Sequence, residues 1–132
     1  MRELFAKIFG SKNHLRTGAA AEEQAELLFK EKGYEILARD YRVSGGELDI
    51  VARKNGMLVF AEVKARRSDA FGGALFAVTK AKQRKLTMAA LGYIKAAKPE
   101  FSSARFDAVL FTAGRPAEHI ENAFPPAAGF DF

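Results

Sequence analysis

The sequence predicts a single α/β domain, a mixed β-sheet flanked by helices, with elements in the order α-β-β-β-α-β. Two long stretches have the apolar period of amphipathic helices, and three segments with strand character lie between them. The chain has 132 residues, which suits one domain large enough to bury a core. We see no internal repeat and no interdomain linker. We therefore expect one unit over 1–132, with an N-terminal arm at 1–14 and a C-terminal tail at 124–132.

Two helices are predicted from apolar side chains that recur every three or four residues. The first covers Leu15–Lys32, and Gly33 ends it because glycine accepts the left-handed conformation that often follows a helix. The second begins near Val78 or Thr79, runs to about Ala97, and is closed by the proline that follows. In the expected arm, apolar residues also recur at helical spacing, which fits either a short docking helix or a frayed end. These arm residues are Leu4, Phe5, Ile8 and Phe9.

Strand character is strongest on either side of Asn55-Gly56, a dipeptide whose tolerance of positive φ makes it a strong hairpin signal. The segment before the first of these strands is charged, so we expect it to be exposed or irregular, and a turn at Ser44-Gly45-Gly46 follows it. The predicted strands are Tyr34–Val43, Glu47–Arg53, Met57–Ala65, Arg105–Thr112 and, as an optional last one, His119–Ala123.

The amino-acid composition limits which binding partners and which kinds of metal or catalytic site are expected. Lys and Arg total 21 against 16 Asp and Glu, a net charge of +5, and such a balance favours a polyanionic partner such as nucleic acid. The chain has no cysteine, which excludes disulfides, thiolate metal sites and cysteine nucleophiles. With two histidines, a multi-histidine zinc site is excluded, so any metal should be Mg²⁺ or Mn²⁺ on carboxylates.

The sequence carries no membrane signal. No apolar run approaches the roughly 20 residues that span a bilayer. The first nine residues are interrupted by charges and lack the apolar core of a secretory signal. We therefore expect a cytoplasmic protein with no membrane partner.

The candidate chemistry lies on the two strands of the predicted hairpin. Strand side chains alternate between faces, so Glu47 and Asp49 should share one face, as should Glu62 and Lys64. The opposite faces are apolar and should belong to the core; they carry Leu48, Ile50, Ala61 and Val63.

Asp49 and Glu62 are 13 positions apart, and the midpoint between them falls at the Asn55-Gly56 turn. The two carboxylates should therefore lie nearly opposite one another on neighbouring strands. Carboxylates at short range repel unless a cation or a proton lies between them. Magnesium satisfies this arrangement, because it binds one or two carboxylates together with water and phosphate oxygens. Lys64 is placed to position a hydrolytic water or to offset charge in a phosphodiester transition state.

A basic set follows the site strand and opens the second helix, where helix N-termini also favour anions. We expect it to contact a phosphate backbone, although a solvated helix face is an equally good interpretation of its helical part. Its members are Arg66, Arg67, Lys80, Lys82, Arg84 and Lys85.

Several candidate residues also have a purely structural interpretation. An E-x-K pair on a strand is commonly two solvated charges, and Glu47 is as suited to stabilising the turn as to binding metal. Asp107 is expected to buttress the sheet. His14 and His119 are expected on the surface. The core is expected to contain Phe60, Phe76, Phe106 and Phe111.

The Asp49 … Glu62-Val63-Lys64 pattern resembles the D-(x)n-E-x-K core of restriction-endonuclease-like PD-(D/E)XK nucleases, and this resemblance implies that the mixed sheet flanked by helices has the restriction-endonuclease-like fold. GELDIVA … LVFAEVKARR, within a similarity from about Gly18 to Leu110, is similar to the YraN-like family of bacterial proteins, which resemble archaeal Holliday-junction resolvases. The resemblance implies a metal-dependent endonuclease acting on DNA, including branched or structured DNA. It also leaves a homodimer open, since junction resolvases act as pairs.

The resemblance further implies that an acid on the first helix supports the metal site. Glu22 takes that role here, with Glu23 as the competing candidate. The family pattern has Gly before this acid and the present chain has Ala21, so the helix packing there is in doubt. Gln83 is implied as a further polar contributor from the second helix. Two non-enzymatic alternatives stay open: a nucleic-acid- or partner-binding module on a nuclease fold, and an assembly protein that uses its Phe-rich ends.

Overall fold

The computed structural model describes residues 14–67 and 78–130. The predicted arm, most of the loop after residue 66, Phe76, Phe132 and the His14 side chain lie outside the described residues. The elements, in chain order, are α2 (His14–Glu31), β1 (Glu35–Val43), β2 (Gly46–Lys54), β3 (Met57–Arg66), α3 (Lys80–Ala97), β4 (Ser103–Thr112) and β5 (Glu118–Phe124).

The strands form one mixed sheet in the order β1-β2-β3-β4-β5. β3 and β4 are parallel because α3 connects them as a crossover, and the other neighbours are antiparallel. The predicted fold class is therefore confirmed, and the strand that the sequence left optional is present as β5. The first strand has an irregular register between Ile36 and Ala38 and a positive φ, +50°, at Asp40.

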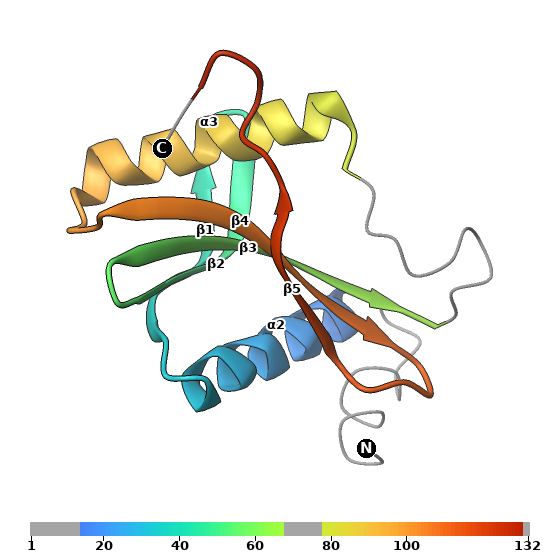
Figure 1. Cartoon of the computed structure of the whole chain (residues 1–132). Coiled ribbons are helices and arrows are strands. Elements are labelled where there is room, and N and C mark those ends of the chain that lie inside the picture. The colour runs from blue at the N-terminus through green and yellow to red at the C-terminus, as the bar shows by residue number, and fades with distance from the viewer. Residues whose placement is uncertain (1–13, 68–77, 131–132) are drawn as a thin grey trace.

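One helix covers each face of the sheet (Figure 1). The α2 side holds a core built around Phe29 and Ile50. The α3 side holds a second core around Phe60, Phe106 and Tyr93. Phe124 stacks on Phe106 with ring centroids 4.8 Å apart, so the end of β5 closes this second core.

Side-chain alternation holds along β3 but fails along β2. Ala61 and Val63 both pack on the α2 side, as expected. Leu48, however, joins the α3-side core while Ile50 joins the α2-side core, so the expected shared face of these two residues is wrong. The cause lies at Asp49, where the ladder between β2 and β3 ends and the facing residue of β1, Asp40, has a φ of +50°.

The tip of the β1–β2 hairpin bends against α3. A Cβ built on Gly46 would meet the Lys85 carbonyl oxygen at 2.9 Å, closer than real Cβ contacts come. A Cβ built on Gly92 of α3 would lie 3.3 Å from Val43 Cγ1, which is also a tight contact. Glycine at these positions lets the hairpin and the helix approach closely, and this contact turns Leu48 toward α3.

Asp107 is a buttress, as expected, and the network around it is buried. Its carboxylate accepts hydrogen bonds from the Arg105 guanidinium at 2.8 and 3.1 Å and from the Asn122 N–H at 3.0 Å. The His119 Nε2 lies 2.8 Å from the same carboxylate. The His119 side chain is 2% exposed, so the expectation of a surface histidine is wrong. It is held inside because Asp107 and the Lys32 ammonium, 2.8 Å from Nδ1, satisfy both ring nitrogens.

The electrostatics of Asp107 match that role. Burial would raise its pKa, but hydrogen bonds from His119, Arg105 and the Asn122 N–H outweigh burial and hold the pKa below its usual value. The ionised carboxylate thus binds an irregular part of β5 to β4, where the register shifts between Phe106 and Ala108.

The chain beyond β5 also folds back. The Thr87 hydroxyl donates to the Gln83 carbonyl and accepts the Ala127 N–H at 2.9 Å. Ala127 is buried, whereas the Phe130 side chain is 42% exposed.

We expect Gly46→Ala to lower the free energy of unfolding by about 2 kcal/mol, because the added methyl group overpacks the hairpin–α3 contact. Gly18→Ala is the matched control: nothing lies within 4 Å of its Cβ position inside α2, so alanine should stabilise by about 0.5–1 kcal/mol. Urea unfolding measures both. Equal effects of the two substitutions would contradict the close approach at Gly46.

Asp107→Asn should cost about 3 kcal/mol near neutral pH, since Arg105 and His119 would lose the anion that they surround. The loss should shrink as the pH falls through the depressed pKa of Asp107, because the wild-type carboxyl then takes up a proton as well. Glu121→Gln removes an exposed carboxylate 3.5 Å from Arg105 and should change stability by less than about 0.5 kcal/mol. Thermal and urea unfolding across pH would test this contrast.

Candidate functional site

Asp49 stands where β2 separates from β3. The register between the two strands runs from Lys54↔Met57 to Ile50↔Ala61, and Asp49 and Glu62 come next, beyond the last pair. In place of a ladder bond, the Val63 N–H donates to Asp49 Oδ2 at 2.8 Å. Asp49 and Glu62 therefore lie on neighbouring strands at the point where β2 and β3 separate.

Three carboxylates interact there, and we call Glu22, Asp49 and Glu62 the acidic cluster. Burial, the Glu62 carboxylate and then Glu22 raise the pKa of Asp49 to about 7, against the opposing hydrogen bond from the Val63 N–H. The pKa of Glu22 is raised too, by burial and by Asp40, and its side chain shares a hydrogen bond with Asp49. Glu22 thus reaches the cluster from α2, whereas Glu23 is exposed.

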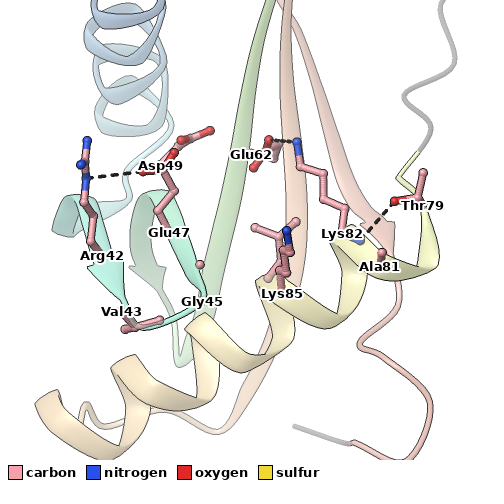
Figure 2. Close-up of a pocket in the computed structure, with 12 residues that line it drawn as sticks. Arg42, Val43, Gly45, Glu47, Asp49, Glu62, Thr79, Ala81, Lys82 and Lys85 are labelled. Atoms are coloured by element: carbon pink, nitrogen blue, oxygen red, sulfur yellow. Dashed lines mark hydrogen bonds and ion pairs between the residues drawn. The ribbon is translucent and has the colours of Figure 1, made fainter.

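Lys82 of α3 bonds to this cluster. Its Nζ lies 2.7 Å from Glu62 Oε1, and the Glu62 side chain is only 10% exposed (Figure 2). Burial would lower the pKa of Lys82, but the bond to Glu62 outweighs it and raises the pKa. Lys64 is exposed, shares the α3 side of β3 with Glu62, and interacts with Lys82.

Asp49, Glu62, Lys82 and Lys85 line a cleft of about 540 Å³ between the hairpin tip and the start of α3 (Figure 2), whereas Glu22 and Lys64 are not among its lining residues. The Asp49 and Glu62 side chains point into it from the sheet, and Lys82 and Lys85 rise from the helix. Glu47 lies at its rim, exposed and 3.5 Å from the Arg42 guanidinium. The remaining lining comes from Arg42, Val43, Gly45, Gly46, Thr79, Ala81 and Leu86.

The remaining predicted residues are divided between the cleft and its surroundings. Lys80, Arg84 and Arg67 are exposed but do not line the cleft. Arg66 is half-buried, and its Nε has no hydrogen-bond partner among the described residues. Gln83 does not line the cleft, and its carbonyl accepts the Thr87 hydroxyl within α3.

Sequence reasoning missed the Lys82–Glu62 pair. It placed Lys82 among the phosphate contacts, since Lys82 belongs to the basic set at the start of the second helix and lies 20 positions from Glu62 in the sequence. One signal was available: the first turn of α3 contains lysine and no acidic residue, the reverse of what the helix dipole favours.

Asp49 and Glu62 fit a hard divalent cation by their donor chemistry. In the described residues no three Asp, Glu, His or Cys side chains form a metal-binding group. Magnesium requires fewer, since one or two carboxylates suffice when water and phosphate oxygens complete its shell. Burial and, after it, the Glu62 carboxylate disfavour the ionised form of Asp49, and a bound cation would offset both effects.

Over the described residues, the fold and the cleft define an α/β protein with a mixed five-stranded sheet, a helix on each face and an acidic–basic cleft at the point where two strands part. Residues 21–111 match the Uncharacterised protein family UPF0102, and the chain belongs to this family. Neither α2 nor α3, the helices of the described residues, is long and apolar enough to cross a bilayer.

Relatives match over most of their length. The chain is 45% identical over 109 residues to a UPF0102 protein of Desulfosudis oleivorans, which covers 81% of this chain and 88% of the relative. It is 40% identical over 125 residues to one of Syntrophus aciditrophicus, with 92% and 98% covered. A third, of Pelobacter propionicus, is 46% identical over 114 residues, with 82% and 81% covered.

Asp49→Asn should stabilise the metal-free protein at about pH 8, on the order of 2 kcal/mol. Because the folded pKa of Asp49, about 7, exceeds the ordinary 3.8, the wild-type protein loses stability as the pH rises between these values. The variant escapes this loss, so the two should converge near pH 4. Urea unfolding with a chelator present measures the difference. Glu47→Gln, at the exposed rim, should show no such gain, and a destabilised Asp49→Asn at pH 8 would contradict the proposed repulsion.

Proposed function

We propose that this protein is a Mg²⁺- or Mn²⁺-dependent endonuclease that hydrolyses phosphodiester bonds in DNA. One observation carries the proposal: Asp49 and Glu62 meet where β2 and β3 part, in a cleft whose other side is lined with lysine. An acidic pair of which Glu62 is buried and Asp49 partly buried, beside basic groups, suits a cation that joins the protein to an anionic phosphate.

The chain's residues then have distinct tasks. Asp49 and Glu62 would hold the cation, with Glu22 orienting Asp49 through their shared hydrogen bond. The bound cation would acidify a water and screen the phosphate charge. Lys64, exposed beside Glu62, would position that water and oppose the charge that develops on phosphate oxygens. Lys85 and the exposed basic residues of α3 would bind flanking phosphates.

The pattern of residues supports DNA as the substrate. Asp49 … Glu62-Val63-Lys64 resembles the core of PD-(D/E)XK nucleases, and the chain resembles Holliday-junction resolvases within that group. These likenesses favour branched or otherwise structured DNA. The net charge of +5 is consistent with a polyanionic partner.

The second candidate is a nucleic-acid- or partner-binding module that keeps the fold without turnover. The basic residues near the start of α3 would serve such a module equally well. The complete Asp-Glu-Lys set favours the enzyme, since binding alone does not require a partly buried, mutually repelling acid pair.

Cleavage of labelled linear, flapped and four-way DNA with Mg²⁺ or Mn²⁺ tests the proposal. We expect metal-dependent cleavage by the wild type, and losses of about 100-fold or more in Asp49→Asn and Lys64→Gln. Glu121→Gln, purified identically, should keep its activity and thereby report any contaminating nuclease.

Cleavage that persists equally in the Asp49 and Lys64 variants would refute the assignment. Binding of DNA without cleavage, under every metal condition, would favour the module instead.

A further inference from the structure

Lys82 occupies a position that helix energetics disfavour. The Thr79 hydroxyl caps α3 and accepts the Lys82 N–H at 3.1 Å, which places Lys82 in the first turn. Backbone N–H groups there carry partial positive charge, so an ammonium is repelled and a carboxylate would be favoured. The presence of Lys82 in the first turn of α3 must therefore be explained by the contacts of its side chain.

Its side chain meets Glu62. The 2.7 Å contact is short for an ammonium–carboxylate hydrogen bond, and the Glu62 side chain is nearly buried. The Lys82 side chain is 39% exposed, so its flexible stem has open space beside the cleft. Glu62 is thus fixed in the sheet, whereas the Lys82 side chain can rotate toward solvent.

The cluster has more negative charge than this one bond neutralises. Asp49 interacts with both Glu22 and Glu62 where the strands part, and among the described residues it accepts a hydrogen bond from the Val63 N–H and shares one with Glu22. Lys82 also lies close enough to Asp49 to interact with its charge and in contact with Lys64. Its ammonium therefore stands at the place where a divalent cation would bind.

We propose that Lys82 is an exchangeable counter-ion: it neutralises Glu62 in the metal-free protein, releases Glu62 to a divalent cation, and then binds a phosphate of the nucleic acid. This inference rests on the proposed function, because it takes Glu62 as a metal ligand and a polyanion as the substrate. It adds a regulatory role to a residue that would otherwise be one more phosphate contact.

Two consequences follow from the exchange. The Lys82 ammonium competes with the metal, so the wild-type protein binds metal more weakly than the carboxylates alone would. Metal and nucleic acid each strengthen the binding of the other, since the released ammonium gains a phosphate, and this coupling is reciprocal.

Calorimetric titration of the full chain with Mn²⁺ tests the competition. We expect Lys82→Gln to bind Mn²⁺ about tenfold more tightly than the wild type, as loss of a competing charged hydrogen bond implies. Lys85→Gln is the matched control: it removes the same charge from the same helix and cleft, yet Lys85 has no described ion pair with Glu62. It should stay within about twofold of the wild type, because an unpaired, exposed charge is screened by solvent.

Equal Mn²⁺ affinities of Lys82→Gln and Lys85→Gln, or weaker binding by Lys82→Gln than by the wild type, would overturn the exchange. Both results leave the proposed function standing. Absence of Mn²⁺ binding in all three proteins would instead refute the metal site and the proposed function with it. Circular dichroism and unfolding curves establish that each variant is folded.

The coupling is measured by fluorescence anisotropy of a labelled DNA duplex with and without Ca²⁺, which takes the same oxygen ligands. Lys85→Gln loses a proposed phosphate contact and should bind DNA more weakly under both conditions, but in it, as in the wild type, Ca²⁺ should tighten DNA binding about fivefold or more. In Lys82→Gln the enhancement should be clearly smaller. An undiminished enhancement would show that Lys82 is not the group transferred from Glu62 to phosphate.

Discussion

The repulsion between Asp49 and Glu62 is the constraint on which the site depends. A regular hairpin would continue the β2–β3 ladder through these residues, but the strands part after Ile50↔Ala61 and the Val63 N–H turns to the Asp49 carboxylate. The separated hairpin tip leans on α3 through Gly46, and the space between tip and helix becomes the cleft. The fold and the site therefore depend on the same geometry. The strand separation that opens the cleft also keeps Asp49 and Glu62 near each other, with little solvent to screen their charges.

Much of this arrangement could be predicted from local sequence. Asn55-Gly56 has the backbone freedom of a tight turn, and both residues have positive φ in the structure. The turn fixes which residues of the two strands face one another, so the proximity of Asp49 and Glu62 follows from counting. The helices were predictable for a similar reason, since Ala21, Ala25 and Phe29 repeat at helical spacing and form the stripe that packs on the sheet.

What could not be predicted depends on contacts between distant segments. Pairing of Lys82 with Glu62 requires the crossover geometry of α3, which no local pattern encodes. His119 was misplaced because a histidine among polar residues suggests a surface, whereas β5 lies beside the buried Asp107 that accepts its hydrogen bond. The opposite orientations of Leu48 and Ile50 depend on a twist at Asp49 and Asp40, where strict alternation no longer applies.

The same sheet contains a second aspartate with a shifted pKa, and the contrast between the two separates structure from function. Asp107 is surrounded by Arg105, His119 and a backbone N–H, and its pKa is depressed. Asp49 faces other carboxylates, and its pKa is raised. A carboxylate that is fully hydrogen-bonded contributes to stability, whereas one held near like charges reduces it. An ionisable group that lowers stability in this way indicates a functional site. A cation that binds together with an anionic substrate would replace the repulsion at Asp49 with attraction.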